Sequence, residues 1–145
     1  MTAIATYLDH NASAPLLPEA RDAVVAALSL TGNPSSVHGH GRALRALVDA
    51  SRAKIAKLAG ATREQLVFTG SATEAITQAI VGVAKALGVG GIVVSAGDHT
   101  AALKAAEATG LPVTAVGLDA NGLIRVDEIA AAMAEAGAAG TKLLI

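Results

Sequence analysis

One short segment near the middle of the chain changes from a strand-like to a helix-like pattern across a turn. A β-favouring apolar run at 66–68 is interrupted by Gly70 and Ser71, and apolar residues at helical spacing follow at once. The turn places small residues and hydroxyl groups at the start of a helix, where unpaired backbone N–H groups and the helix dipole favour a phosphate. The pattern predicts a strand at 65–69, a helix at 72–87 and a phosphate-bearing ligand at the turn between them.

Strands and helices continue to alternate after this segment. We expect strands at 91–95 and 112–117, a further strand that begins near Lys142, and helices at 100–109 and 127–136. Because the connections are short, the alternation predicts an α/β fold whose sheet is at least partly parallel.

The first 60 residues show no such alternation. Residues 1–17 are irregular, and Pro18 fits the first turn of a helix that runs to about residue 30. A turn-rich loop at 31–41 leads into an amphipathic helix at 42–59. This part of the chain is therefore expected to be helical.

Composition excludes several classes of function. The chain has 145 residues, a net charge of −1, 1% aromatic residues and no cysteine. Without a basic stripe or an aromatic platform, nucleic-acid binding is not expected. No cysteine nucleophile, disulfide or thiolate metal site exists within the chain, and His10, His38 and His40 lack the ligand spacing of a metal site. No membrane span or signal peptide is recognised, so a cytosolic protein is expected.

Two segments that follow predicted strands are candidates for a ligand site, because ligands of open α/β sheets bind beyond the carboxyl ends of the strands. One segment contains Ser71 and Thr73, and the other contains His99. If the strands at 65–69 and 91–95 are parallel, Thr73 and His99 lie at the same edge of the sheet. Two alternatives need no ligand: Ser71 and Glu74 form a capping box, and His99 is simply a residue at a helix start.

Four short motifs follow one another along the chain. They are Tyr7-Leu8-Asp9-His10-Asn11-Ala12-Ser13-Ala14-Pro15; Gly32-Asn33-Pro34-Ser35-Ser36-Val37-His38 closing with Gly41-Arg42; Phe68-Thr69-Gly70-Ser71-Ala72-Thr73-Glu74; and Asp98-His99 followed by Ala102-Leu103. In this order they resemble motifs of the cysteine desulfurases, pyridoxal-phosphate enzymes of the class V aminotransferase group. In the third motif, Gly and Ser stand in exchanged order.

The resemblance implies roles for individual residues. Ala72 and Thr73 would hold the cofactor phosphate through backbone N–H groups and the Thr73 hydroxyl. His99 would stack on the pyridine ring of pyridoxal 5'-phosphate and assist proton transfers, which makes it the catalytic candidate. Asn11 would line the entrance to the active site, and Arg42 with the loop before it would be mainly structural.

The resemblance also implies an architecture. The chain would supply the N-terminal portion of a fold type I large domain of the pyridoxal-phosphate-dependent transferases, a three-layer α/β/α structure whose sheet is incomplete here. Residues 1–17 would be an N-terminal arm that belongs to the small domain, and residues 18–145 the first part of the cofactor-binding large domain. The family works as a homodimer.

The chain departs from the family pattern in two further ways. The paired Asn residues that usually follow the third motif are replaced by Ala75-Ile76-Thr77. The chain also lacks the nucleophilic Cys, and none of its lysines stands in the motif that bonds the cofactor; these are Lys54, Lys57, Lys85, Lys104 and Lys142. The chain is therefore expected to be inactive alone and to make no covalent bond to the cofactor.

The expected parent reaction converts L-cysteine to alanine and passes sulfur, as a persulfide, to an acceptor protein for iron–sulfur cluster or thio-cofactor assembly. The chain would be the N-terminal segment of such an enzyme. Two alternatives stay open. The parent is another class V enzyme, such as an aminotransferase or a selenocysteine lyase, or the chain is a non-catalytic remnant or one subunit of a split enzyme.

Overall fold

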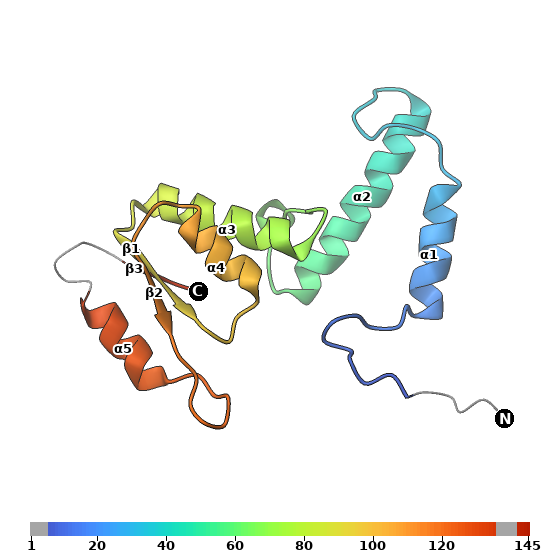
Figure 1. The fold of residues 1–145 in the computed structure, drawn as a ribbon. Coiled ribbons are helices and arrows are strands. Elements are labelled where there is room, and N and C mark those ends of the chain that lie inside the picture. The colour runs from blue at the N-terminus through green and yellow to red at the C-terminus, as the bar shows by residue number, and fades with distance from the viewer. Residues whose placement is uncertain (1–5, 136–141) are drawn as a thin grey trace. The chain divides into compact units, whose positions relative to one another are not determined.

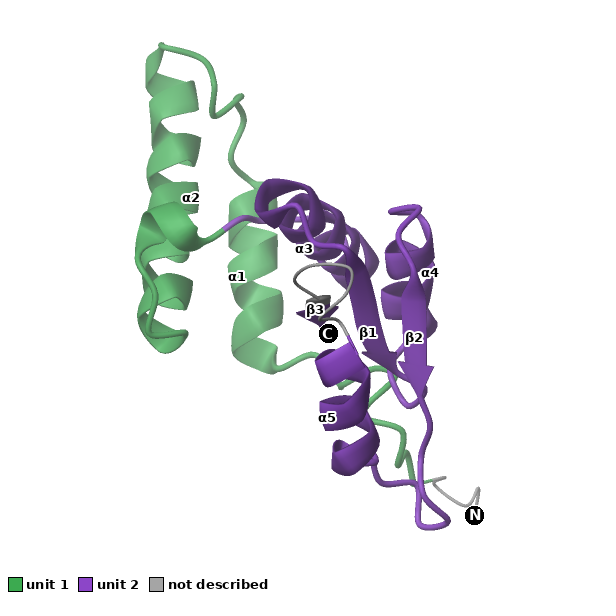
Figure 2. Cartoon of the chain, turned by 90° about the vertical axis from the view of Figure 1, so that its left-hand side faces the viewer, with its two compact units in different colours: residues 1–66 green, residues 67–145 purple. Residues whose placement is uncertain are grey.

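A three-stranded parallel sheet forms the centre of residues 67–145, one of the two units into which the chain divides (Figure 2). The computed structural model describes residues 6–135 and 142–145. Strand β1 (Gly91–Ser95) lies between β2 (Val113–Val116) and β3 (Lys142–Leu144), and both neighbours run parallel to it. The predicted α/β fold with a parallel sheet is confirmed.

Helices cover both faces of this sheet (Figure 1). Helices α3 (Ala72–Leu87) and α4 (Thr100–Glu107) pack on one face, and α5 (Val126–Ala134) packs on the other. The arrangement is the three-layer α/β/α structure that the family resemblance implied.

Strand β1 is buried on both faces because its side chains alternate between the two helical layers. Ile92 and Val94 pack with α3 and α4, whereas Val93 packs with Val116 of β2 and Ala132 of α5. All five residues of the strand are buried, and Ile92, Val93 and Val94 are each no more than 1% exposed. The continuous apolar run in the sequence therefore marks the central strand.

The predicted strand at 65–69 is wrong. Arg63–Gln65 form a 3-10 helix, η1, and residues 66–69 belong to no strand in the described part of the chain. The backbone of Leu66 is extended (φ −97°, ψ 127°), so the β-favouring residues do set the local conformation. A strand also needs a neighbour, and residues 66–69 pair with none of the three strands of the described sheet.

The remaining differences from the predicted elements are at their ends. The helix predicted at 100–109 ends at Glu107, and the strand predicted at 112–117 is two residues shorter, at Val113–Val116. The end predicted at residue 136 for the last helix lies outside the described residues.

The other unit, residues 1–66, contains α1 (Pro18–Leu28), α2 (Gly39–Leu58) and η1. Helix α2 begins three residues earlier than predicted because His38 caps it: Nδ1 of His38 accepts a hydrogen bond of 3.3 Å from the N–H of Gly41. Gly41 must be glycine, since a Cβ there would lie 2.4 Å from the carbonyl oxygen of Ser36. This close contact fixes the turn that leads into the helix.

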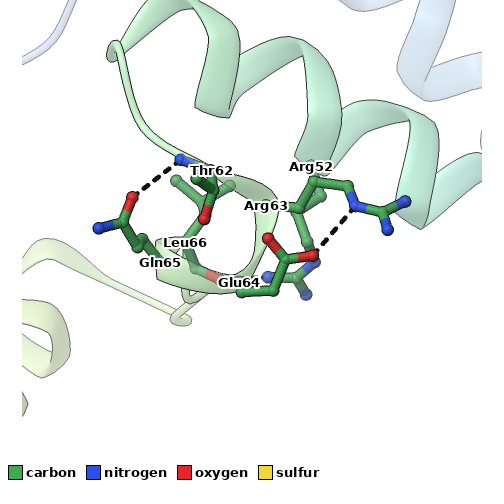
Figure 3. A network of polar contacts seen from close by, with 6 residues as sticks. All are labelled: Arg52, Thr62, Arg63, Glu64, Gln65 and Leu66. Carbon is green, nitrogen blue, oxygen red and sulfur yellow. Dashed lines mark hydrogen bonds and ion pairs between the residues drawn. The ribbon is translucent and has the colours of Figure 1, made fainter.

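A polar network joins the end of α2 to η1 (Figure 3). Nη1 of Arg52 donates to the carbonyl of Leu66, and the N–H of Thr62 donates to Oε1 of Gln65 at 2.9 Å. Arg63 and Glu64 form an exposed ion pair of 3.3 Å. These contacts hold the turn at 62–66 and connect it to α2, which has already ended at Leu58.

None of the helices in residues 6–135 is long and apolar enough to cross a membrane.

Ile92→Ala is expected to lower the free energy of unfolding by about 2–5 kcal/mol, because it removes a fully buried side chain from the central strand. Urea unfolding followed by circular dichroism measures the change. Leu87→Ala is the matched control, since Leu87 is 66% exposed and its loss should change stability little. Equal effects of the two substitutions would contradict the assigned core.

The pKa of Glu64 lies below its ordinary value, first because a backbone N–H donates to its carboxylate, and then because of the Thr62 side chain and Arg63. A lowered pKa stabilises the fold at a pH above the ordinary value, and this contribution is lost as the pH falls through the lowered one. Thr62→Val is expected to raise the pKa of Glu64, measured by NMR titration of its carboxyl carbon. An unchanged titration would show that Thr62 has no part in the shift.

Candidate phosphate-binding site

Helices α3 and α4 both begin toward the carboxyl edge of the sheet. Residues 88–90 connect the end of α3 to the start of β1, and residues 96–99 connect the end of β1 to the start of α4. The two helices lie side by side and run opposite to β1 (Figure 1). Thr73 and His99 were predicted at one edge on the premise of a strand at 65–69. No strand forms there. Thr73 and His99 are instead placed toward the same edge by the directions of α3 and α4, which both begin there.

The turn before α3 is fixed by short hydrogen bonds. Ser71, the N-cap, has an extended backbone (φ −160°, ψ 161°), and its Oγ accepts from the N–H of Glu74 at 3.2 Å. Oε2 of Glu74 accepts from the N–H of Gly70 at 2.8 Å. The structure therefore differs from the capping box considered from the sequence. The Glu74 carboxylate bonds the N–H of Gly70, the residue before the N-cap, instead of the N–H of Ser71.

The N–H groups of Ala72 and Thr73 make no hydrogen bond within the described part of the chain. The Thr73 side chain is exposed, and its hydroxyl makes none there either, whereas its carbonyl accepts from the hydroxyl of Thr77 at 2.8 Å. Two N–H donors and a hydroxyl thus lie at the positive end of a 16-residue helix. This set of donors fits the oxygens of a phosphate.

A second turn, at the end of β1, presents His99. Oδ2 of Asp98 accepts from the N–H of Ser95 at 3.3 Å, and Oγ of Ser95 accepts from the N–H of Gly97 at 3.0 Å. Ser95 is buried, so the turn is tied to the sheet.

His99 itself is the N-cap of α4. Its Nδ1 accepts from the N–H of Ala101 at 3.1 Å. In the neutral ring the proton is consequently on Nε2, and the exposed position of the residue leaves this atom open to solvent or a ligand. The imidazole is held by its cap in one tautomer, which is useful for a ring that stacks on a ligand.

Asn11 belongs to the other unit, where it lies in an exposed turn closed by a hydrogen bond of 3.2 Å from the N–H of Ala12 to the carbonyl of Asp9. In the same unit, Arg42 donates to the carbonyl of Val37 and so supports the loop before α2. Among residues 6–135 and 142–145, no three acidic or histidine side chains are placed to hold a metal ion.

Sequence reasoning missed two polar contacts of these turns. It identified Glu74 only as a partner of Ser71, and it gave no role to the contact between Asp98 and Ser95. The spacing of three residues between Ser95 and Asp98, directly after a buried strand, is a signal that could have indicated this turn.

Comparison with known proteins identifies the family. Residues 6–139 match the model of the class-V aminotransferases. Cysteine desulfurase IscS of Dictyoglomus turgidum is 37% identical over 133 residues, which cover 88% of this chain and 34% of the relative. The chain belongs to the cysteine desulfurase family.

Further relatives agree with this assignment. Cysteine desulfurase IscS of Pectobacterium carotovorum is 38% identical over 138 residues, covering 89% of the chain and 34% of the relative. The solved structure of a NifS-like protein from Rickettsia africae covers 95% of this chain and 38% of its own, with a TM-score of 0.78 and 26% identity. A second NifS-like structure gives a TM-score of 0.73 and 27% identity over 83% of this chain and 35% of its own.

These matches confirm the predicted family and its fold, that of the fold type I enzymes that depend on pyridoxal phosphate. The chain spans about a third of the length of the curated cysteine desulfurases that it matches. The family's cofactor carries a phosphate, which is the ligand that the start of α3 fits.

Ser71→Ala is expected to lower the free energy of unfolding by about 1 kcal/mol, because it removes the side-chain cap of α3. Urea unfolding measures this loss. Ser71→Asp keeps an acceptor at the N-cap and should retain most of the stability. Thr77→Ala in the same helix is the control for loss of a hydroxyl. If all three variants match the unmodified chain, the Ser71 cap does not stabilise α3.

Proposed function

We propose that this chain forms the phosphate-binding part of the pyridoxal-phosphate site in a cysteine desulfurase-like enzyme. The backbone N–H groups of Ala72 and Thr73 and the hydroxyl of Thr73 hold the cofactor phosphate. The observation that carries the proposal is the pair of unpaired N–H groups at the start of α3, in a family that depends on a phosphate-bearing cofactor.

His99 is the proposed catalytic residue of this chain. Its ring would stack on the pyridine ring of the cofactor, and its Nε2 would hold or release a proton during the reaction. The bond from Ala101 to Nδ1 supports this role, because Nε2 of this exposed residue is the nitrogen outside that bond. Pyridoxal phosphate, when bound, supplies an electron sink for a substrate carbanion. Asn11 lines the entrance to the site.

The reaction proposed for the whole enzyme is conversion of L-cysteine to alanine, with the sulfur passed to an acceptor protein for iron–sulfur cluster or thio-cofactor assembly. The chain contains no cysteine. The thiol that accepts sulfur, and the lysine that bonds the cofactor, are therefore proposed to lie on polypeptide outside these 145 residues.

The proposed organisation follows the family. Residues 1–17 act as an arm of the small domain, and residues 18–145 open the large domain of a cytosolic homodimer. The division of the described structure at residue 66 does not test the boundary proposed after residue 17.

Thr73→Ala is expected to weaken binding of pyridoxal phosphate by about tenfold or more, because a hydrogen bond to a charged group contributes about 1.5–3 kcal/mol. Titration of the 145-residue chain, followed by cofactor absorbance, measures the dissociation constant. Thr114→Ala is the control, since Thr114 is an exposed residue of β2. It lies on the face of the sheet that α5 covers, opposite α3, because it is in register with Val93.

Pyridoxal, which lacks the phosphate, provides the second arm of this titration. Thr73→Ala should leave its weak binding unchanged, because the proposed contacts are with the phosphate. Equal affinity of the unmodified chain for pyridoxal and pyridoxal phosphate would overturn the proposed phosphate site.

The intact mass of the native protein in its source cells tests where the missing groups lie. A species much larger than 14.2 kDa that contains these peptides supports the enzyme on one polypeptide. A species of 14.2 kDa instead supports a split enzyme or a non-catalytic remnant, and directs the search to a partner chain that carries the lysine and the cysteine.

A further inference from the structure

We infer that Glu74 is a positioning residue, whose carboxylate holds the turn that presents Ala72 and Thr73 to a phosphate. This inference rests on the proposed function. It concerns the hydrogen bonds of Glu74 to Gly70 and Gln78, which do not use the N–H groups proposed to bind the phosphate.

Both oxygens of the Glu74 carboxylate are used. Oε2 accepts from the N–H of Gly70 at 2.8 Å, and Oε1 accepts from Nε2 of Gln78 at 3.3 Å. Gln78 is four residues further along the same helix, so it holds the carboxylate against the helix surface. The side chain thereby links the residue before the N-cap to the second turn of α3.

Gly70 leaves room for this contact. A Cβ at this position would lie 3.2 Å from Oε2 of Glu74, so the carboxylate would have to shift by a few tenths of an ångström to make room for a side chain. The exchanged order of Gly and Ser in this motif therefore has a structural consequence: the serine becomes the N-cap, and the glycine before it donates to Glu74.

The segment that leads into the turn is not paired with the strands of the sheet, so the contact of Glu74 with Gly70 adds to the hydrogen bonds that hold it. Residues 66–69 lead into the turn without joining the sheet of the described residues. Before the N-cap, the hydroxyl of Thr69 donates to the carbonyl of Ser71 at 3.0 Å, a bond within the turn itself. The bond from Gly70 to Glu74 is thus one contact that ties this segment to α3.

The negative charge of Glu74 has the opposite effect to its hydrogen bonds. A carboxylate at the start of a helix competes electrostatically with a bound phosphate, since like charges repel. A role in binding must then come from the geometry of the acceptor and not from the charge. Glutamine at this position separates the two effects, because its amide oxygen still accepts from Gly70 and its charge is zero.

The test is a comparison of Glu74→Ala and Glu74→Gln in the 145-residue chain, titrated with pyridoxal phosphate. Glu74→Ala should weaken binding about three- to tenfold, as expected for loss of one hydrogen bond. Glu74→Gln should bind at least as tightly as the unmodified chain. Glu107→Ala, which removes the same charge from the last residue of α4, is the control and should change binding less than twofold.

Amide hydrogen exchange of Gly70 without any ligand gives an independent readout. Its exchange should become about tenfold faster in Glu74→Ala and stay unchanged in Glu74→Gln. Circular dichroism verifies that each variant keeps its helices. If Glu74→Ala fails to fold, Gln78→Ala replaces it, and should also speed Gly70 exchange.

The outcomes separate this inference from the proposed function. If the unmodified chain binds no pyridoxal phosphate, the proposed function fails. Faster exchange of Gly70 in Glu74→Ala would then still show that Glu74 holds the turn through Gly70. If the unmodified chain binds the cofactor but Glu74→Ala binds it equally well, the inference fails and the proposed function stands. The inference is also overturned if Glu74→Gln loses as much binding as Glu74→Ala. Binding would then not depend on the side-chain oxygen that accepts from Gly70.

Discussion

Burial of β1 between two helical layers is the constraint on which the candidate site depends. Val93 faces α5, whereas Ile92 and Val94 face α3 and α4, so the strand is covered on both sides. The short connections on either side of this strand then fix the directions of α3 and α4. Both helices begin toward the carboxyl edge, which is where an open α/β sheet binds its ligands.

Small side chains make this packing possible in a chain with 1% aromatic residues. Helix α4 buries Ala101, Ala102, Ala105 and Ala106 against its neighbours, and α3 adds Ala84. Alanine lets both helices pack closely on the sheet. The same feature limits the area that each residue buries, and so makes the local hydrogen bonds of the turns more important for holding the site.

The chemistry of the site is set by which backbone donors are already satisfied. At the start of α3, the Ser71 hydroxyl accepts from the N–H of Glu74, and the Glu74 carboxylate accepts from the N–H of Gly70. The N–H groups of Ala72 and Thr73 remain for a ligand. At the start of α4, Nδ1 of the exposed residue His99 accepts from the N–H of Ala101, and Nε2 takes no part in this cap. The two helix starts thus differ: one presents donors to an anion, and the other presents an oriented imidazole.

The sequence by itself determined the helices, the central strand, the cap at Ser71 and the family motifs, because periodicity and caps involve residues within about four positions of each other. Only the tertiary structure decided that residues 66–69 form no strand and that Glu74 reaches Gly70 instead of Ser71. Strand formation depends on a neighbour from a distant part of the chain, and the β-favouring residues 66–68 carry no information about that neighbour. The reach of Glu74 depends on the backbone angles of the turn, which residue types alone do not specify.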